Sequence, residues 1–225
     1  MNKFLIFIAV FLFTYQFVNA QTEKGNQTLG VNLGLQYSKA SDIAVNPGDN
    51  SVTTTKTNYN SFNIGPNYSY FIANKLDIGT SLSYSKFTSD NSNNVSNPKV
   101  TGRNFEAMIY LRKYFLYDNK IGFRVGPYLA YMYGDSKNTY APVNSIYSVE
   151  NKNYNYMGGF NLALVYYPTK KLGVSANIAN LEYDHAKNTA SYQNAVDNDH
   201  GKSNNVYFDF INNGLSLSIF YTFGS

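Results

Sequence analysis

The sequence predicts an all-β protein: an eight-stranded antiparallel up-and-down transmembrane β-barrel with short periplasmic turns and four long outer loops. Three observations predict this fold class. Apolar residues alternate with small or polar residues at a period of two in segment after segment, and helical spacing is scarcely visible. The segments number eight, and their connections alternate between short and long. After residue 20, the chain contains no run of about 18 apolar residues, the length that a membrane-spanning helix requires.

The composition excludes several classes of protein. The chain has 225 residues and no Cys, so disulfide scaffolds, Cys-ligated metal sites and thiol catalysis are ruled out. Its formal net charge is only +4, without a run of Lys or Arg, which gives little support to nucleic-acid binding. No Gly-rich phosphate loop or dinucleotide fingerprint is present, and we expect no cofactor.

The first twenty residues differ from the rest of the chain. They contain a short basic start, an apolar stretch and small residues at the usual cleavage positions: Met1–Lys3, Phe4–Phe13 and Val18–Ala20. We therefore expect residues 1–20 to be a signal peptide and residues 21–225 to form the barrel domain. A membrane-anchoring helix is the alternative, but polar residues interrupt this apolar stretch too early.

Each of the eight segments has one apolar face. In the first, Leu29, Val31 and Leu33 alternate with Gly30 and Asn32. The fourth differs, because its second face mixes charged and aromatic residues. The segments are residues 29–37, 62–72, 76–85, 105–112, 121–133, 154–166, 172–178 and 215–223.

The connections indicate which ends of the strands face the periplasm. Three links are tight and polar, at residues 73–75, 117–120 and 168–171. Four are long and rich in Asn, Ser, Asp, Thr and Lys, at about 39–57, 87–102, 135–152 and 184–204. Short turns on one side and long loops on the other are typical of outer-membrane barrels, whereas a soluble barrel has no reason to segregate them.

The apolar face is expected to meet lipid. Eight strands enclose a lumen only wide enough for side chains, so the face rich in Gly, Ser and Asn fits inside. Tyrosines near the strand ends are expected to form aromatic girdles: Tyr68, Tyr70, Tyr84, Tyr131, Tyr133, Tyr154, Tyr156 and Tyr166. A soluble periplasmic barrel that binds an apolar ligand would instead place Leu33, Ile64, Leu111 and Leu217 inside.

Three sequence stretches carry a resemblance to a known family. They are Ile109–Phe115 before a short turn, Gly126–Tyr131 in the next strand, and the aromatic-ended strand Leu215–Phe223. Over the whole chain after residue 20, the sequence resembles the small outer-membrane β-barrel proteins of the porin-like superfamily, of the Bacteroidetes-type outer membrane protein β-barrel domain. The resemblance implies that Tyr221 and Phe223 form the signal that the barrel assembly machinery reads, although Gly224 and Ser225 follow the aromatic residue that usually ends the family's chains.

Charged residues on the inward face are the candidate site. The alternation points five of them into the lumen: Asp77, Glu106, Arg112, Arg124 and Asp209. Counting from the turn at 117–120 places Arg112 and Arg124 at similar depth, with Asp77 near the same end. Because buried charges must be paired, we interpret this lumen charge network as a structural plug, with a narrow selective pore as the alternative.

Enzyme and metal sites have weak support in the sequence. Both histidines, His185 and His200, fall in the last expected loop, with Asp184, Asp197 and Asp199 nearby and Ser191 or Ser203 as conceivable nucleophiles. Such loop residues lack rigid support, and their spacing matches no acyltransferase pattern, so we expect neither catalysis nor a metal site.

These expectations combine into one functional hypothesis. We expect a protein of the cell outer membrane that contacts outer-membrane lipid and lipopolysaccharide and has a non-enzymatic structural or surface-interaction role. A narrow porin for small solutes is the first alternative, and the soluble ligand-binding barrel is the second. The polar loops name no external partner.

Overall fold

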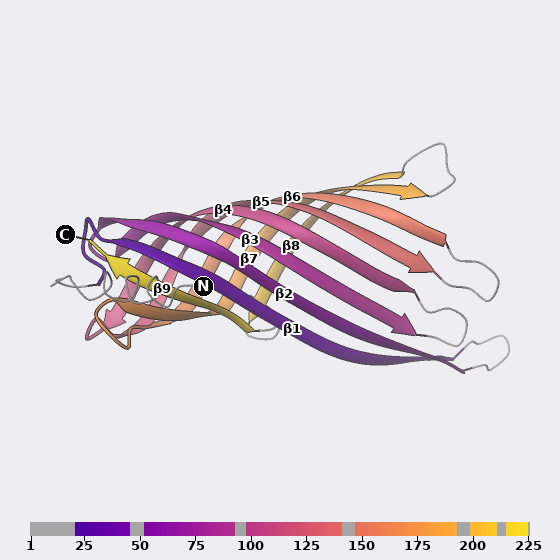
Figure 1. The fold of residues 1–225 in the computed structure, drawn as a ribbon, viewed down its shortest axis with the longest axis horizontal. Coiled ribbons are helices and arrows are strands. Elements are labelled where there is room, and N and C mark those ends of the chain that lie inside the picture. Colours follow the sequence, from indigo (N-terminus) through magenta and orange to yellow (C-terminus); the bar gives the residue numbers. More distant parts are fainter. Residues whose placement is uncertain are drawn as a thin grey trace, which may run out of the picture.

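The architecture is a single ring of strands. The computed structural model describes residues 21–45, 52–92, 98–140, 147–192, 199–210 and 215–224. Nine strands run obliquely around the ring (Figure 1). They are β1 (Gln27–Val45), β2 (Val52–Ala73), β3 (Leu76–Ser92), β4 (Lys99–Tyr117), β5 (Ile121–Tyr140), β6 (Tyr147–Tyr166), β7 (Leu172–Tyr192), β8 (Asp199–Phe210) and β9 (Leu215–Phe223).

The ring has eight positions because β8 and β9 share one of them. Strands β1 to β7 pair antiparallel in chain order. The start of β7 then pairs with β9, and its outer part pairs with β8. Pairing of β9 with β1 closes the ring. The predicted all-β, antiparallel up-and-down barrel is confirmed.

The three short turns lie where the sequence places them. They connect β2 to β3, β4 to β5 and β6 to β7 at one end of the barrel. Lys75, Asp118 and Asn119 adopt positive φ values there, a conformation that Asn and Asp tolerate better than most residues.

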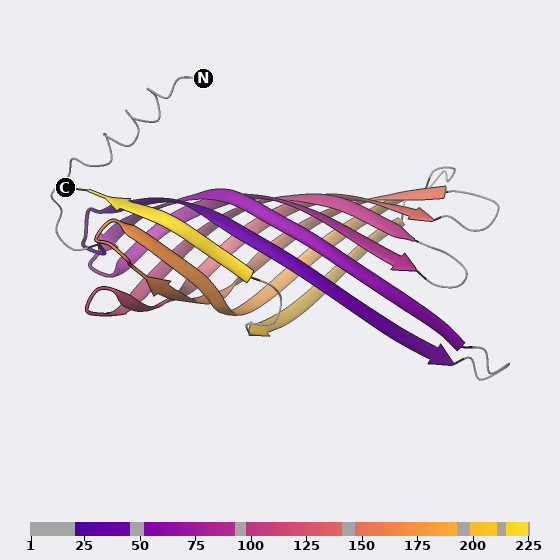
Figure 2. The same ribbon diagram turned by 60° about the horizontal axis from the view of Figure 1, so that its bottom comes forward.

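The prediction of four long outer loops was wrong in extent. Strand β1 continues to Val45 and β2 begins at Val52, and the same extension occurs at the other three outer connections (Figure 2). These extensions are rich in Ser, Thr and Asn and lack the apolar alternation of the inner segments. Backbone hydrogen bonding between antiparallel neighbours does not require that alternation, so the pairing continues. Only the middle of each expected loop lies outside the described residues.

The outward face is apolar toward the end of the barrel that carries the short turns. We call this end the lower end, and the apolar surface there the apolar belt. Leu29, Ile109 and Leu129 are more than half exposed on it. Tyr131 packs on Tyr156 at its outer rim, with ring centroids 5.3 Å apart. So many exposed large apolar side chains are what a lipid-facing surface requires.

The four residues that distinguish the membrane barrel from the soluble barrel lie on the outside. Leu33 and Ile64 are exposed, and Leu111 and Leu217 share their outward faces as half-buried residues. The soluble alternative, which needs these side chains in the interior, does not fit this arrangement.

Candidate functional site

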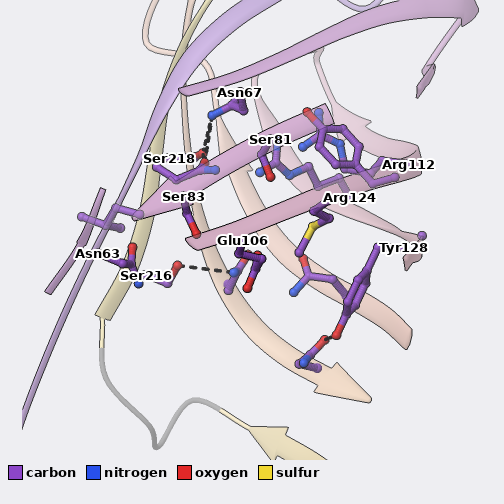
Figure 3. A pocket seen from close by; sticks show the side chains of 18 of the residues that line it. Asn63, Asn67, Ser81, Ser83, Glu106, Arg112, Arg124, Tyr128, Ser216 and Ser218 are labelled. Carbon is purple, nitrogen blue, oxygen red and sulfur yellow. Dashed lines mark hydrogen bonds between the residues drawn. The ribbon is translucent and has the colours of Figure 1, made fainter. Parts of the chain in front are cut away.

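The lumen holds a small polar cavity. Its volume is about 250 Å³, and its lining comes from eight strands, with Asn and Ser as the most frequent residues (Figure 3). The inward positions of β1, β2 and β3 carry Asn32, Asn63, Asn67, Ser81 and Ser83. Small amide and hydroxyl groups fit here because eight strands leave little room inside.

A buried ion pair lies at the floor of this cavity. Asp77 on β3 is in register with Arg112 on β4. Arg112 donates to both carboxylate oxygens, with Nη2 at 2.6 Å and Nε at 3.1 Å. Ser69 Oγ and the hydroxyl of Tyr114 also donate to Asp77, at 2.7 Å and 3.0 Å. Asp77 is fully buried, so these donors are needed to compensate its charge.

The second arginine is held differently. Arg124 on β5 is in register with Tyr114, two residues nearer the turn than Arg112. Its Nη2 donates to Ser175 Oγ at 2.7 Å, and its guanidinium lies 5.5 Å from the ring centre of Phe220. Its positive charge therefore lies beside the ion pair and adds to the attraction for Asp77.

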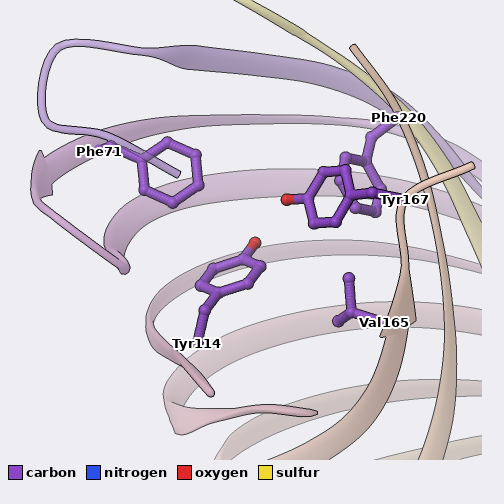
Figure 4. Close-up of a cluster of buried hydrophobic side chains, with 5 residues drawn as sticks. All are labelled: Phe71, Tyr114, Val165, Tyr167 and Phe220. Atoms are coloured by element: carbon purple, nitrogen blue, oxygen red, sulfur yellow. The ribbon is translucent and has the colours of Figure 1, made fainter. Parts of the chain in front are cut away.

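Apolar side chains fill the lumen between the ion pair and the turns. Phe71, Tyr114, Val165, Tyr167 and Phe220 are each at most 2% exposed and form one cluster (Figure 4). The rings of Phe71 and Tyr114 are 5.4 Å apart, and those of Tyr167 and Phe220 are 5.5 Å apart. We call these five residues the periplasmic plug.

The segment before β1 lies against the same end of the barrel. Gln21 Nε2 donates to the carbonyl of Thr169 in the β6–β7 turn, at 3.0 Å. The carbonyl of Thr22 accepts from the backbone N–H of Lys75 in the β2–β3 turn, at 2.7 Å. These bonds join two turns on different hairpins, so the segment crosses the end of the barrel next to the plug.

Two carboxylates lie higher in the lumen. Glu106 on β4 and Glu182 on β7 both line the cavity. Glu182 accepts a 2.5 Å hydrogen bond from the hydroxyl of Tyr128 and a 3.3 Å bond from Asn180 Nδ2. The cavity therefore has arginines at its floor and carboxylates above.

The structure separates the five residues of the expected charge network. It brings Asp77, Arg112 and Arg124 together at the floor. Glu106 lies above them in the cavity lining, which Glu182 shares, while Asp209 lies on β8 in register with Asn180. The two residues expected to form the assembly signal, Tyr221 and Phe223, lie on β9, opposite Leu29 and Gln27.

The histidines lie on strands, and the expectation of a loop was wrong. His185 is on β7, where its Nδ1 is 2.7 Å from Asn204 Oδ1. His200 is on β8, where its Nδ1 is 3.3 Å from Thr189 Oγ1. Within the described ranges, no group of three His, Cys, Asp or Glu residues could hold a metal ion. Asp184 binds Asn155 Nδ2 through both oxygens, and Asp197 lies outside the described residues.

Sequence reasoning missed the periplasmic plug and Glu182. Part of the plug could have been predicted, because Tyr110 and Arg112 show that the inward face of their strand carries aromatic and charged residues. The same alternation continued to the turn makes Tyr114 inward-facing. Glu182 was missed because the expected seventh segment ended at residue 178.

Comparisons with known proteins agree with this architecture. The model of the outer membrane protein beta-barrel domain family matches residues 19–186. A search of curated proteins found no match. No helix in the described part of the chain is long and apolar enough to span a bilayer.

Solved structures of several outer-membrane proteins are similar in fold. One is Ail, the attachment invasion locus protein of Yersinia pestis: 13% identity, 89% of this chain and 99% of that chain covered, TM-score 0.38. A second is outer membrane protein OprG from Pseudomonas aeruginosa: 15% identity, 92% and 100% covered, TM-score 0.39. A third is the outer membrane protease OmpT from Escherichia coli: 9% identity, 92% and 97% covered, TM-score 0.39.

Proposed function

Because the chain belongs to the outer membrane protein beta-barrel domain family, we propose that it is a non-enzymatic outer-membrane barrel with a structural or surface-interaction role and a closed lumen. One observation carries this proposal. The five residues of the periplasmic plug are buried across the lumen, directly below the Asp77–Arg112 ion pair. A lumen filled in this way transmits no solute to the periplasm, so the narrow-porin alternative has less support.

The arrangement of the histidines supports a non-enzymatic role. The ring nitrogens of His185 and His200 contact Asn204 and Thr189, which are neither nucleophiles paired with a carboxylate nor metal ligands. Asp184, next to His185, points to the opposite side of β7 and binds Asn155. His185 is therefore not held between a carboxylate and a nucleophile, as the base of a catalytic triad is.

The outer ends of the strands support a surface role. Basic side chains follow the outer rim of the apolar belt on the outward face: Lys39, Lys86, Arg103, Lys152, Lys187 and Lys202. Phosphate groups of lipopolysaccharide are the natural partners of such a rim, since a cation near a membrane surface attracts anionic headgroups. Above this rim the strands present polar residues to the exterior.

The C-terminal strand supports assembly by the barrel assembly machinery. Tyr221 shares the outward face of β9 with Ile219, and the pairing of β9 with β1 closes the ring. An aromatic-ended strand in this position is available to the machinery before β1 pairs with it. The role of Tyr221 and Phe223 as a recognition signal belongs to this proposal.

Planar-bilayer conductance tests the closed lumen. We expect the refolded wild-type protein to produce no ion channel. Removing two plug rings with Phe71→Ala and Tyr114→Ala should open a conducting path, because their buried rings meet across the lumen. The matched control is Phe115→Ala with Phe123→Ala, two aromatic residues that face outward from β4 and β5 at similar depth. Stable channels in the wild-type protein would contradict the proposal and favour the narrow porin.

A further inference from the structure

The barrel wall is joined along only part of the seam between its first and last strands. Strand β1 pairs with β9 from Gln27 to Leu35, and beyond Leu35 its only partner in the described part of the chain is β2. Among the described residues, β8 pairs only with β7. Within the described ranges, the outer part of β1 and all of β8 therefore have no partner strand on the edges that face each other, and Figure 2 shows the outer ends of β1 and β2 lying apart from that of β8. We call this unpaired part of the seam the opening.

Side-chain exposure agrees with this opening. On β1, consecutive residues from Tyr37 to Ile43 are exposed on both faces, as expected for a strand with no wall beside it. On β8, Val206 and Phe208 are 72% and 71% exposed, and the inward-facing Tyr207 is also exposed.

The inner end of the opening lies within the apolar belt. Phe208 is in register with Leu181, and Leu181 with Phe160, which makes one row of outward apolar side chains. Charge begins further out, where Lys187 is in register with Lys202. The edge of β8 from Val206 to Phe210 therefore borders lipid.

Unpaired backbone groups at this depth require a polar neighbour. Hydrocarbon satisfies none of the N–H and C=O groups along a strand edge, so such an edge persists only beside protein or a water-filled cavity. The lumen supplies that cavity, since its polar wall includes Asn32 on β1, Asn177 on β7 and Ser216 on β9, close to the base of the opening.

The described residues close the lumen toward the short turns. The periplasmic plug closes its lower end. Its volume of about 250 Å³ accommodates a polar headgroup but not a long chain. A molecule whose head occupies the cavity can extend only outward to water or sideways between β1 and β8.

We propose that the barrel binds a single-chain amphiphile, whose polar head is hydrogen-bonded by the lumen amides while its apolar chain passes between β1 and β8 into the outer leaflet. The head meets Asn and Ser side chains. The chain meets Tyr207 and Phe208, on the two faces of β8. The opening is thus a lateral passage between the lumen and the membrane.

Tryptophan quenching tests the passage, because the chain has no native Trp. Three single-Trp variants are reconstituted in vesicles of phosphatidylcholine with brominated acyl chains. We expect Tyr207→Trp, which faces inward beside the opening, to lose most of its fluorescence, nearly as Phe208→Trp on the lipid side does. Tyr110→Trp, inward on β4 and 8% exposed, is the matched control and should retain its fluorescence. A Tyr207→Trp signal as protected as that of Tyr110→Trp would overturn the proposal.

Binding of the amphiphile is measured with the same reporter in unlabelled vesicles. Nitroxide-labelled lysophosphatidylcholine should quench the fluorescence of Tyr207→Trp saturably. The quenching of Phe208→Trp should instead rise in proportion to the amount of the labelled lipid that partitions into the bilayer. Asn177→Ala, which removes a lumen amide, should weaken the saturable quenching several-fold. Quenching that never saturates would overturn binding of the head.

A covalent strap provides a second, independent measurement. Because the chain has no Cys, Tyr37→Cys and Phe210→Cys can be joined by a bis-maleimide across the base of the opening. We expect the strap to reduce the saturable quenching. The control strap joins Tyr37→Cys to Asn60→Cys, which are already paired on β1 and β2, and should leave it unchanged. Concentration-dependent dimers that protect Tyr207→Trp would assign the two edges to a second copy and overturn the passage.

Discussion

At the scale of single residues, the buried ion pair is the feature on which lumen stability depends most. Replacing Asp77 with Asn leaves Arg112 buried without its counter-charge, with Arg124 nearby. We expect a loss of about 3–5 kcal/mol in the free energy of unfolding. Urea titration followed by far-UV circular dichroism measures it.

The control for this prediction is a surface pair on neighbouring strands. Asp135→Asn removes the partner of the exposed Arg103 and should change stability little, because water screens that pair. Equal losses in the two variants would show that the Asp77 carboxylate is not buried in a closed lumen.

A second residue-scale prediction concerns a close approach of two strands. A Cβ atom added at Gly65 would meet the carbonyl oxygen of Leu82 on β3. Gly65→Leu should therefore prevent refolding or lower its yield severely. Gly201→Leu, where nothing lies within 4 Å of the added Cβ, should refold normally. Similar yields from the two variants would contradict the inward position of Gly65.

The sequence predicts the floor of the lumen better than its plug. Asp77 and Arg112 could be found by counting from a turn, since a period of two fixes which side chains share a face and how deep they lie. Phe71, Tyr167 and Phe220 could not, because an aromatic side chain near a strand end fits a lipid girdle as well as a lumen. Only the closed ring shows that these three point inward.

At the scale of elements, the strands are longer than alternation indicates. Hydrophobic alternation ends where a strand leaves the membrane, but backbone pairing does not depend on it, so β1 and β2 continue past the belt. Strand β8 was missed for the same reason, because its first residues are Asp, His, Gly, Lys, Ser and Asn. Only its last residues, Val206 to Phe210, show the apolar alternation.

The outer extension of β1 and β2 should be dispensable for folding. Ala40 to Ile43 are exposed on both faces of β1, so this part of the strand stabilises little beyond its own hairpin. Replacing residues 40–57 with Asn-Gly joins Lys39 to Asn58, which are already opposite each other. We expect this variant to refold into vesicles with the yield of the wild-type protein. A clear loss of yield would show that the extension supports the ring.

At the scale of the whole molecule, the outer-membrane assignment requires the apolar face of the barrel to meet lipid. Ile109→Arg places a charge on the outward face and should cost about 2–4 kcal/mol if that site lies near the bilayer midplane. Met108→Arg places the same charge in the lumen beside Glu106, where it gains a partner. Refolding titrations in vesicles compare the two variants. A greater loss at Met108 than at Ile109 would reverse the two faces.

The central claim is that this chain forms a lipid-facing β-barrel in the outer membrane. Fractionation followed by a heat-modifiability gel tests it most directly, with outer-membrane extract run unboiled and boiled. We predict that the chain is found in the outer-membrane fraction and that it migrates differently before boiling, because the paired ring resists detergent until heated. A chain found in the soluble periplasmic fraction, with the same mobility before and after boiling, would contradict the account.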